Sequence, residues 1–457
     1  MINLADHSNI HCIGIGGIGL SGIAEILLFR GYKVSGSDMN TSEITEKLAA
    51  HGAKIYQGHR AENVEDADLI IYSAAIAEEN PEIIRAREKG IPLASRAEVL
   101  GLLMDEFPES IAISGTHGKT TTTSMVSLIL EDAKYNPTIL VGGNLNEIGG
   151  NYKVGEGDFF VTEACEYRDS FLELRPEIEV ILNIDSDHLD YFKDIDHIVS
   201  SFDRFTENVR PGGTIVAYDS NPFVNRVIKD RPNVVTYGYN QGSTYSIQDV
   251  KFEQNGMPSF DIHHDGENLG RVTLSVPGEH NILNAGAAFA CCHELGVNPG
   301  IIIETLSQYR GTQRRFDVLG QTDKGVMLVD DYAHHPTEIR ATLSAAQNLP
   351  HSRLWCLFQP HTYTRTLALF DEFAEAFEKA DILILVDIYA AREKNIHNIS
   401  SKNLADRIKE THPDKEILYI PDFKELAEKV KSEAKEGDLV ITMGAGDIYK
   451  VGQLIMN

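Results

Sequence analysis

The sequence has few cysteines and no long apolar run, and each shortage excludes a class of protein. None of the five cysteines belongs to a CxxC pair, so neither a zinc ribbon nor a thiol redox motif is supported. An odd, unpatterned set fits the reduced thiols of a cytosolic protein. The longest apolar runs, such as ILILV at 382–386, have the length of a strand and are too short to span a bilayer. Because the first residues, MINLADHSN, also lack the basic and apolar regions of a secretion signal, we expect a soluble cytoplasmic protein.

Positive charge is scarce as well. The chain carries 41 basic and 68 acidic residues, which gives a net charge of −27. Such an acidic surface repels nucleic acid and anionic membranes, and we expect no partner of either kind. It does not exclude anionic small molecules, because a site can gather its few cations locally. The excess of acidic residues otherwise keeps the protein soluble. We expect a monomer or a weak homodimer.

Repeats, low-complexity tracts and long linkers are missing too, while the order of predicted strands and helices is informative. A chain of 457 residues should form two or three domains. Strand-like runs such as HCIGIGG and ADLIIYSAAI alternate with helix-like segments, which predicts parallel sheets built from βαβ units. The polar bridge MDEFPES and the junction near GTQRRFDVLG divide the chain, and we expect domains over 1–105, 106–311 and 312–457. From about position 245, alternating apolar and polar residues indicate a small antiparallel patch in the second domain.

The first glycine-rich stretch lies between a predicted strand and a predicted helix. Gly14, Gly16 and Gly19 have GxGxxG spacing, and Asp38 ends the next strand, 22 residues after Gly16. Glycines at these positions let backbone amides approach a pyrophosphate at a helix N-terminus, and the acid can meet a ribose. A tight strand–helix turn without a ligand is the alternative. The stretch favours a Rossmann-like domain that binds a pyrophosphate, and it does not specify nicotinamide.

A second glycine-rich stretch, ISGTHGKTTTT, lacks two residues of the usual phosphate-binding loop. Two residues separate Gly115 from Gly118, where the usual pattern has four. The strand-like IAIS before it and the helix-like TTTSMVSLIL after it still favour an anion cradle over a chance Gly-Lys-Thr. In such a loop Lys119 meets the β- and γ-phosphates, and Thr120 offers its hydroxyl to Mg²⁺. Two cradles suggest two phosphorylated ligands, the second in a P-loop ATPase-like domain.

Acidic residues follow two later strands. Glu163 and Glu166 end DFFVTEACE, and NIDSDHLD supplies Asp185, Asp187, His188 and Asp190. Ligands gather at the carboxyl ends of strands in open α/β sheets, so these side chains can hold a magnesium ion that bridges nucleotide phosphates. For any single acid a solvated loop or a helix cap is the alternative. Together with Lys119 and Thr120, the group favours a nucleotide site.

Two motifs of the third predicted domain, VDDYAHHPTE and FQPHTYTRT, also follow strands. They bring to one sheet edge Asp331, Tyr332, His334, His335, His361 and Arg365. His334 and His335 are adjacent and point differently, so a zinc site is disfavoured. Arg314 and Arg315, at the domain junction, either hold phosphate or pair with the abundant acids.

These motifs, in this order, resemble those of the Mur ligase family, ATP-dependent enzymes that build the peptide of bacterial peptidoglycan. The family's short loop, GTxGKT, accounts for the two missing residues. The matching stretches span positions 11 to 366: HCIGIGGIGLSGIAE, VSGSD, ISGTHGKTTTT, VTEACEYRDSFL, LNIDSDHLDYF, PGEHNILNAGAA, RRFDVLG, DDYAHHPTE and FQPHTYTRT. The resemblance implies a Rossmann-like domain for a UDP-sugar, a central ATP-binding domain and a Rossmann-like C-terminal domain for the amino acid.

Carried onto matching positions, the resemblance implies a role for each motif residue. The UDP-sugar would be bound by Gly16, Gly17, Ile18, Gly19, Ser37, Asp38, Ser73 and His117. ATP would be bound by Gly115, Thr116, His117, Gly118, Lys119, Thr120, Thr121, Asn281, Asn284, Arg315 and Asp331. Mg²⁺ would be held by Thr120, Glu163 and His188, and the amino acid by Tyr332, His334, His361 and Arg365. The catalytic residues would be Lys119, Glu163, His188 and Arg315.

The implied reaction attaches L-alanine to the carboxylate of UDP-N-acetylmuramate. ATP phosphorylates the carboxylate, the alanine amine attacks the acyl phosphate, and a tetrahedral intermediate collapses to amide and phosphate. Two anions meet in the first step, so Lys119, Mg²⁺ and the arginines have to stabilise the migrating phosphoryl group. Either His188 or His334 could take the proton of the amine.

Three alternatives stay open. A murein-tripeptide ligase of the same family would use the same sugar. An NAD-dependent oxidoreductase would leave the second loop and the acids unexplained, and a nucleotide-regulated binding module would leave the lysine, acid and arginine set without a purpose. Two departures bear on details. Thr362 stands where alanine-adding members often have arginine, which leaves Arg365 as the partner for the alanine carboxylate. The lysine that follows DHLD is Lys193, which lies very close to the motif, so we expect no carbamylated lysine, as in other alanine-adding members.

Overall fold

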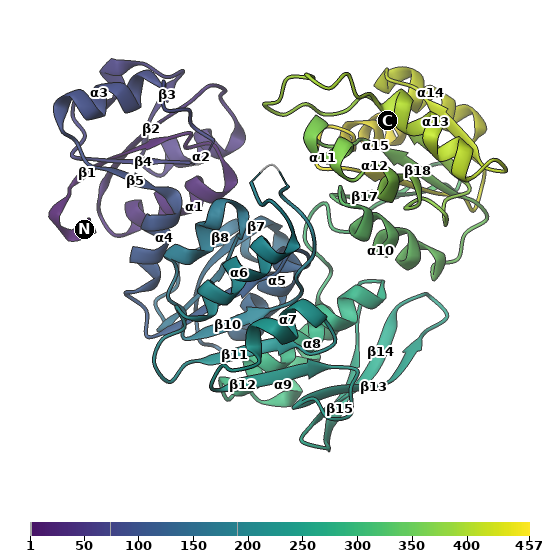
Figure 1. The fold of residues 1–457 in the computed structure, drawn as a ribbon, viewed down its shortest axis with the longest axis horizontal. Coiled ribbons are helices and arrows are strands. Elements are labelled where there is room, and N and C mark those ends of the chain that lie inside the picture. The colour runs from purple at the N-terminus through teal and green to yellow at the C-terminus, as the bar shows by residue number, and fades with distance from the viewer. Residues whose placement is uncertain (1, 74, 190) are drawn as a thin grey trace.

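The computed structural model describes residues 2–73, 75–189 and 191–457, which form three α/β domains (Figure 1). The first domain holds a parallel sheet in the order β3-β2-β1-β4-β5. Its strands are β1 (Asn9–Ile13), β2 (Lys33–Asp38), β3 (Lys54–Gln57), β4 (Leu69–Tyr72) and β5 (Leu93–Ser95), and its helices are α1 (Ile18–Phe29), α2 (Glu43–Ala50), α3 (Pro81–Lys89) and α4 (Arg96–Met104). The strand order reverses at β1, so the glycine-rich loop after β1 opens where such sheets bind ligands.

The second domain contains one sheet in the order β15-β14-β13-β12-β11-β10-β6-β9-β7-β8. Its strands are β6 (Glu109–Ser114), β7 (Thr138–Leu145), β8 (Gly150–Lys153), β9 (Phe159–Glu163), β10 (Ile178–Ile181), β11 (Thr214–Tyr218), β12 (Val234–Gly238), β13 (Tyr245–Phe252), β14 (Pro258–His264) and β15 (Glu267–Thr273). Its helices are α5 (Lys119–Asp132), α6 (Ile195–Thr206), α7 (Pro222–Ile228), α8 (Glu279–Glu294) and α9 (Pro299–Gln308). The predicted antiparallel patch is confirmed as β13–β15, and it extends the main sheet because β12 pairs with β13 in parallel.

The third domain has a sheet in the order β16-β17-β21-β18-β19-β20, with β16 as an antiparallel edge. Its strands are β16 (Asp317–Gln321), β17 (Met327–Asp331), β18 (Leu354–Phe358), β19 (Ile382–Leu385), β20 (Glu416–Tyr419) and β21 (Leu439–Met443). Its helices are α10 (Pro336–Gln347), α11 (Tyr363–Ala368), α12 (Phe370–Ala374), α13 (Ser401–Thr411), α14 (Phe423–Glu433) and α15 (Tyr449–Met456). Both β17 and β18 pair with β21, so the two motifs that follow them emerge one strand apart at the same edge.

Apolar packing joins the first two domains. One buried cluster includes Leu20 of α1, Leu140 of β7 and Phe171 of the 3₁₀ segment Tyr167–Glu173. Gly101 of α4 lies so close to that segment that a Cβ on it would be 2.2 Å from a carbonyl oxygen. The third domain has separate clusters on the two faces of its own sheet. The three-domain α/β prediction is confirmed, and we propose boundaries at 105/106 and 311/312, which fall between the sheets.

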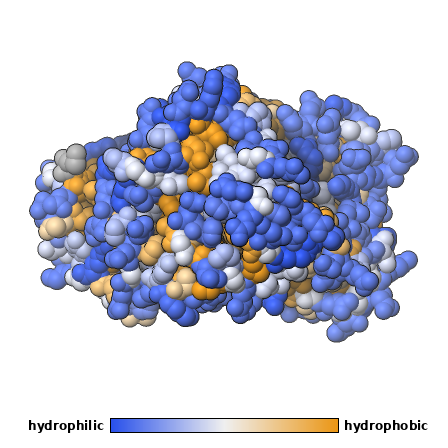
Figure 2. All heavy atoms as spheres, turned by 90° about the horizontal axis from the view of Figure 1, so that it is seen from below, coloured by the Kyte–Doolittle hydropathy of each residue, from blue (hydrophilic) through white to orange (hydrophobic). Residues whose placement is uncertain are grey.

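The surface is mostly polar on the face seen in Figure 2, and hydrophobic residues show between the hydrophilic groups. Across the described ranges, every helix is too short or too polar to cross a bilayer.

Candidate active site

The loop between β1 and α1 packs closely against two charged side chains, Asp38 and Arg96. The amide of Gly16 donates to Asp38 Oδ2 over 3.0 Å, and a Cβ on Gly16 would lie 2.9 Å from that oxygen. Gly17 precedes α1, so the amides of this helix N-terminus are available to an anion. The Arg96 guanidinium lies beside Gly19, where a Cβ would come within 3.0 Å of it. Arg96, which the sequence analysis did not single out, adds positive charge to this anion site.

The residues of the first domain that were predicted for the UDP-sugar gather around this loop: Gly16, Gly17, Ile18, Gly19, Ser37, Asp38 and Ser73. They lie at different depths. Ser73 Oγ is close to Gly14, where a Cβ would be 3.5 Å from it. Ser37 is buried, its hydroxyl donates to Glu82 Oε2 over 2.6 Å, and its carbonyl accepts the Gly14 amide over 2.8 Å. In the proposed sugar site, Ser37 therefore supports the loop between β1 and α1 and does not contact the ligand through its hydroxyl.

The second loop follows β6 and ends at the start of α5. Gly115 and Gly118 have φ angles of +135° and +89°, and a Cβ on Gly118 would lie 2.5 Å from Asn284 Oδ1. Both positions therefore require glycine. Asn183, just after β10, accepts the amide of His117 and donates to its carbonyl, over 2.8 and 2.9 Å. This side chain, which the sequence analysis missed, holds the short loop in place.

Lys119 is anchored at the mouth of this loop. Its Nζ donates to the carbonyl oxygens of Gly115 and Thr116, and to Glu166 Oε2 over 2.8 Å. Burial lowers the pKa of Lys119, but Glu166 outweighs that effect and the pKa is raised, so the ammonium stays charged. Glu166 is 2% exposed, and its Oε1 has no hydrogen-bond partner among the described residues. A buried carboxylate oxygen without a donor suits a cation.

The residues predicted for Mg²⁺ lie around Lys119 and its partner Glu166. Glu163 Oε1 accepts the amide of Gly142 over 2.6 Å, and the Thr120 side chain lies against the neighbouring Gly143. His188 has a φ of +54°, and its Nε2 lies 3.6 Å from Glu166 Oε1. The Glu163 carboxylate and the Thr120 hydroxyl offer the oxygen ligands that Mg²⁺ prefers, whereas the His188 imidazole offers a nitrogen, so the fit to the ion rests on Glu163 and Thr120.

A cavity of about 390 Å³ opens between the second and third domains, beside the phosphate loop. The predicted ATP-binding residues in its lining are His117, Gly118, Thr121, Asn281, Asn284, Arg315 and Asp331. Tyr218, Phe223 and Val276 add apolar wall, and the volume is in the range of sites for small organic ligands. The Asp331 carboxylate accepts two backbone amides over 2.7 Å each, and burial raises its pKa to about 6. The cavity can take a base and a ribose whose phosphates lie on the loop.

The four residues predicted for the amino acid meet on the third-domain side. Arg365 Nη1 lies 3.2 Å from His361 Nδ1, and the His334 ring lies 5.4 Å from that of Tyr332 and 5.8 Å from that of His361. Burial lowers the pKa of His334 to about 3 and that of His361 to about 4, so both are neutral at pH 7. Arg365 Nε and Nη2 donate to Asp187 Oδ1 over 3.1 and 3.0 Å. An incoming carboxylate would have to share Arg365 with Asp187.

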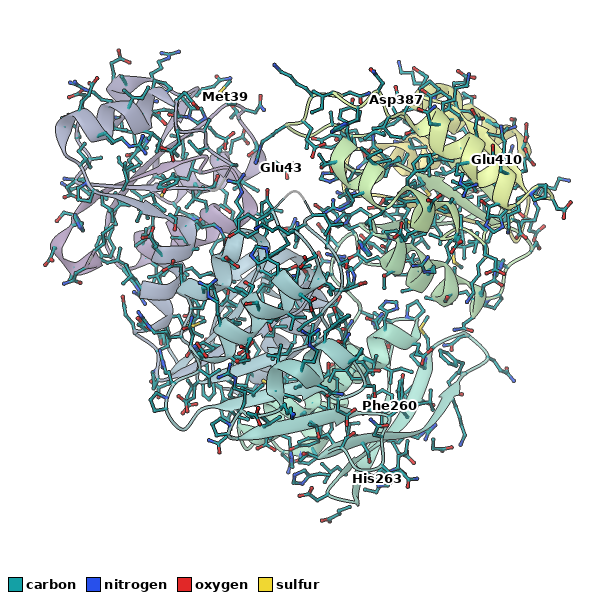
Figure 3. The ribbon with its side chains drawn as sticks, viewed as in Figure 1. Met39, Glu43, Phe260, His263, Asp387 and Glu410 are labelled. Carbon is teal, nitrogen blue, oxygen red and sulfur yellow. The ribbon has the colours of Figure 1, made fainter. Side chains whose placement is uncertain are left out.

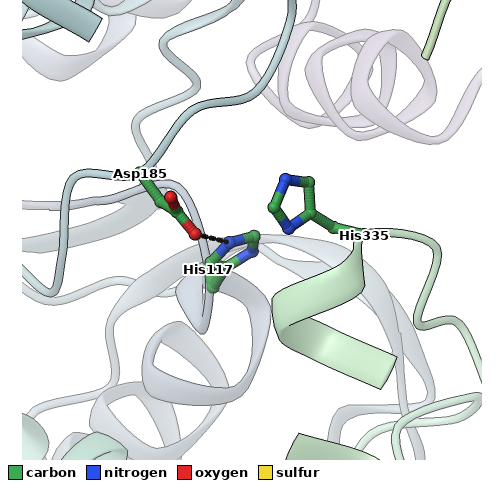
Figure 4. Close-up of side chains that lie close together, drawn as sticks. All are labelled: His117, Asp185 and His335. Atoms are coloured by element: carbon green, nitrogen blue, oxygen red, sulfur yellow. Dashed lines mark hydrogen bonds and ion pairs between the residues drawn. The ribbon is translucent and has the colours of Figure 1, made fainter. Parts of the chain in front are cut away.

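His117, Asp185 and His335 lie close enough together to be considered as metal ligands (Figure 4). His335 Nδ1 accepts the Thr337 amide over 3.2 Å, so Nε2 carries the proton and donates to the Ser186 carbonyl over 2.9 Å. His117 Nε2 lies 3.2 Å from Asp185 Oδ2. Both rings are engaged in hydrogen bonds, and neither offers a lone pair toward a shared point. The cluster is a hydrogen-bonded contact between domains.

Three domain families match the chain in order. They are the Mur ligase family, catalytic domain, over residues 9–108, the Mur ligase middle domain over 113–292, and the Mur ligase, glutamate ligase domain, over 314–446. The chain belongs to the Mur ligase family. Mur ligases are ATP-dependent ligases, and the oxidoreductase and the non-catalytic binding module are thereby set aside.

Relatives of this Mur ligase cover its whole length. The UDP-N-acetylmuramate–L-alanine ligase of Alkaliphilus metalliredigens (strain QYMF) is 49% identical over 457 residues, with 99% of this chain and 98% of the relative covered. That of Clostridium botulinum (strain Loch Maree / Type A3) is 51% identical over 452 residues, with the same coverage. The crystal structure of the UDP-N-acetylmuramate-alanine ligase of Thermotoga maritima is 30% identical, with a TM-score of 0.83 and 98% of both chains covered. A murein peptide ligase of Psychrobacter arcticus, 23% identical with a TM-score of 0.73, shares the fold.

Parts of the site of this Mur ligase were not apparent from its sequence. Asn183 and Glu338 lie inside the quoted stretches LNIDSDHLDYF and DDYAHHPTE, yet neither had been given a role. Glu166 was noted as one of several acids, and the structure makes it the partner of Lys119. Asp190 lies outside the described residues. The roles of the predicted site residues in binding and catalysis stay proposals.

Proposed function

We propose that this Mur ligase joins L-alanine to the carboxylate of UDP-N-acetylmuramate with ATP, in peptidoglycan biosynthesis. Identity near 50% over the full chain to ligases of that name carries the proposal. The convergence of the motif residues around one interdomain cavity supports it. Because ATP is the substrate, we propose that the enzyme acts in the cytoplasm.

The first step transfers the γ-phosphoryl group of ATP to the carboxylate of the sugar, which releases ADP and forms an acyl phosphate. Lys119 is charged and lies at the start of α5, where it can follow the migrating phosphoryl group. Arg315, in the cavity wall, is placed to neutralise phosphate charge. Thr120, Glu163 and His188 would hold Mg²⁺, which supplies further positive charge to the phosphates when bound.

The second step forms the amide. The amine of alanine attacks the acyl carbon, the tetrahedral intermediate expels phosphate, and the proton that the amine loses passes to the departing phosphate or to solvent. His334 Nδ1 lies 3.0 Å from the Tyr332 carbonyl oxygen, so Nδ1 carries the proton and Nε2 is left as an acceptor. Because the pKa of His334 is lowered to about 3, it is a weak base, and we propose that it orients the amine by accepting a hydrogen bond.

Phosphate release from ATP tests the proposal directly. Purified protein with Mg²⁺ and UDP-N-acetylmuramate should release phosphate when L-alanine is added and should give UDP-N-acetylmuramoyl-L-alanine by mass spectrometry. Release with the murein tripeptide instead of alanine would identify the tripeptide-adding alternative. No release with either amine donor would refute both.

A further inference from the structure

Glu338 lies where the two halves of the site meet. It belongs to the first turn of α10, and its Oε2 accepts the amides of His334 and His335 over 3.0 and 3.3 Å. Its Oε1 lies 3.2 Å from Nδ1 of His117, in the phosphate loop of the second domain. The Glu338 side chain is 15% exposed. One largely buried carboxylate therefore contacts both the phosphate loop and the amino-acid segment.

The partner of Glu338 in the phosphate loop is a cation. His117 Nδ1 faces Glu338 and its Nε2 faces Asp185, each at 3.2 Å. A carboxylate can only accept, so both ring nitrogens donate and the ring is an imidazolium. Burial lowers the pKa of His117, but the hydrogen bonds to Asp185 and Glu338 outweigh that effect and raise the pKa to about 9. The contact between the domains is thus an ion pair with fixed geometry on both sides.

Three other hydrogen bonds between these domains involve the segment after β10 of the second domain. They join Thr337 to Asp185 (2.8 Å), His335 to Ser186 (2.9 Å) and Arg365 to Asp187 (3.0 Å). All three hold the segment after β10. The pair of His117 and Glu338 holds the phosphate loop itself. It therefore links the loop that would carry the phosphates of ATP directly to the segment that would carry the amino acid.

We propose that Glu338 is a positioning residue that closes the third domain on the phosphate loop through His117 and presents the amino-acid segment to the nucleotide. The identity of the substrates in this inference rests on the proposed function, whereas the contact does not. Alanine meets its site only when the domains are together, while the phosphates of ATP lie on the second domain in either arrangement. Loss of the pair therefore weakens alanine binding more than ATP binding.

The variant Glu338→Gln removes the charge and keeps an oxygen that can accept the amides of His334 and His335. The KM for alanine should rise about tenfold, the size expected for losing a charge-assisted hydrogen bond, with kcat and the KM for ATP little changed. His117→Gln, on the other side of the contact, should also raise the KM for alanine; because His117 lines the proposed ATP cavity, its KM for ATP is expected to change as well and does not serve as a control. The double variant should be no worse than the poorer single variant, because the two changes remove one interaction.

A matched control and a structural measurement complete the test. Glu410→Gln removes the exposed partner of Arg407 (3.3 Å) on α13, far from the site (Figure 3), and should change nothing. Small-angle scattering with Mg²⁺ and a non-hydrolysable ATP analogue should show a larger radius of gyration for Glu338→Gln and His117→Gln than for wild type, with thermal unfolding checking that both fold. The proposal would be overturned if the effects of the two single variants on the alanine KM added up in the double variant. It would also be overturned if both single variants kept the wild-type alanine KM or the wild-type radius of gyration. If the wild type does not use alanine, the proposed function fails, and the scattering still decides on the contact.

Discussion

Replacing Lys119 with alanine tests the phosphate loop through catalysis and through stability. The proposed first step brings an anionic carboxylate to an anionic phosphate, and Lys119 supplies a fixed positive charge there. Losing one preorganised electrostatic contact of this kind costs about 3–4 kcal/mol of the barrier, or roughly 10²–10³-fold in rate. Steady-state ligation by Lys119→Ala should fall at least about a hundredfold.

The same change also affects folding, because Glu166 is 2% exposed and receives the Lys119 ammonium at 2.8 Å. Removing one partner of a buried ion pair typically costs about 3–5 kcal/mol. We therefore expect the second domain to lose about 3 kcal/mol of unfolding free energy at pH 7.

Adding Glu166→Gln separates the two effects. In the Lys119→Ala background it removes the unpaired charge, so denaturant unfolding should recover most of the lost stability while ligation stays abolished. A single variant as stable as wild type would refute the buried ion pair. Ligation reduced less than tenfold would show that this loop is not the ATP site.

Four further predictions concern the amino acid, the nucleotide and a lysine. Arg365→Lys should raise the KM for alanine by about tenfold or more, because an ammonium cannot reproduce a bidentate pair with a carboxylate, and an unchanged KM would remove Arg365 from the site. The wild type should use glycine and serine measurably, since one methyl discriminates by only about 1–3 kcal/mol, and competition assays that found neither used would contradict this. Burial raises the pKa of Asp331 to about 6, so its contribution to the stability of the fold is lost as the pH rises through 6. Over the same range, from about pH 5 to 7, kcat/KM for ATP should rise because the carboxylate forms. The pH profile of Asp331→Asn should lack that rise. Crystals with nucleotide and Mg²⁺ should show Lys193 unmodified, and carbamate density on a lysine beside the metal would disprove it.

The strands of the three sheets could be predicted where they are continuous apolar runs between glycine-rich turns, as in IAISG before the phosphate loop. The missed strands had weaker signals. The strand over residues 138–145 begins with the apolar TILV but ends with GGNL, which is not typical of a strand. The pairing of β12 with β13 depends on tertiary contacts and cannot be predicted from the local sequence. The two phosphate-binding loops could be predicted from the spacing of their glycines. A Cβ on Gly16 or Gly118 would come too close to a neighbouring side-chain oxygen, so glycine is favoured at both positions. The contact of Glu338 with His117 could not be predicted, because it joins residues 221 positions apart.

The position of the cavity has a consequence for the speed of the enzyme. Its walls come from both the second and the third domain, with Asn281 on one side and Asp331 on the other. We propose that a nucleotide bound there is released when Thr337 and His335 separate from residues 185–186. Each catalytic cycle then contains one opening of the domains, and the opening rate is a ceiling on turnover however fast the chemistry is. A compound that filled the cavity and made better contacts with both walls would have a residence time set by that opening, so its potency would lie in slow release.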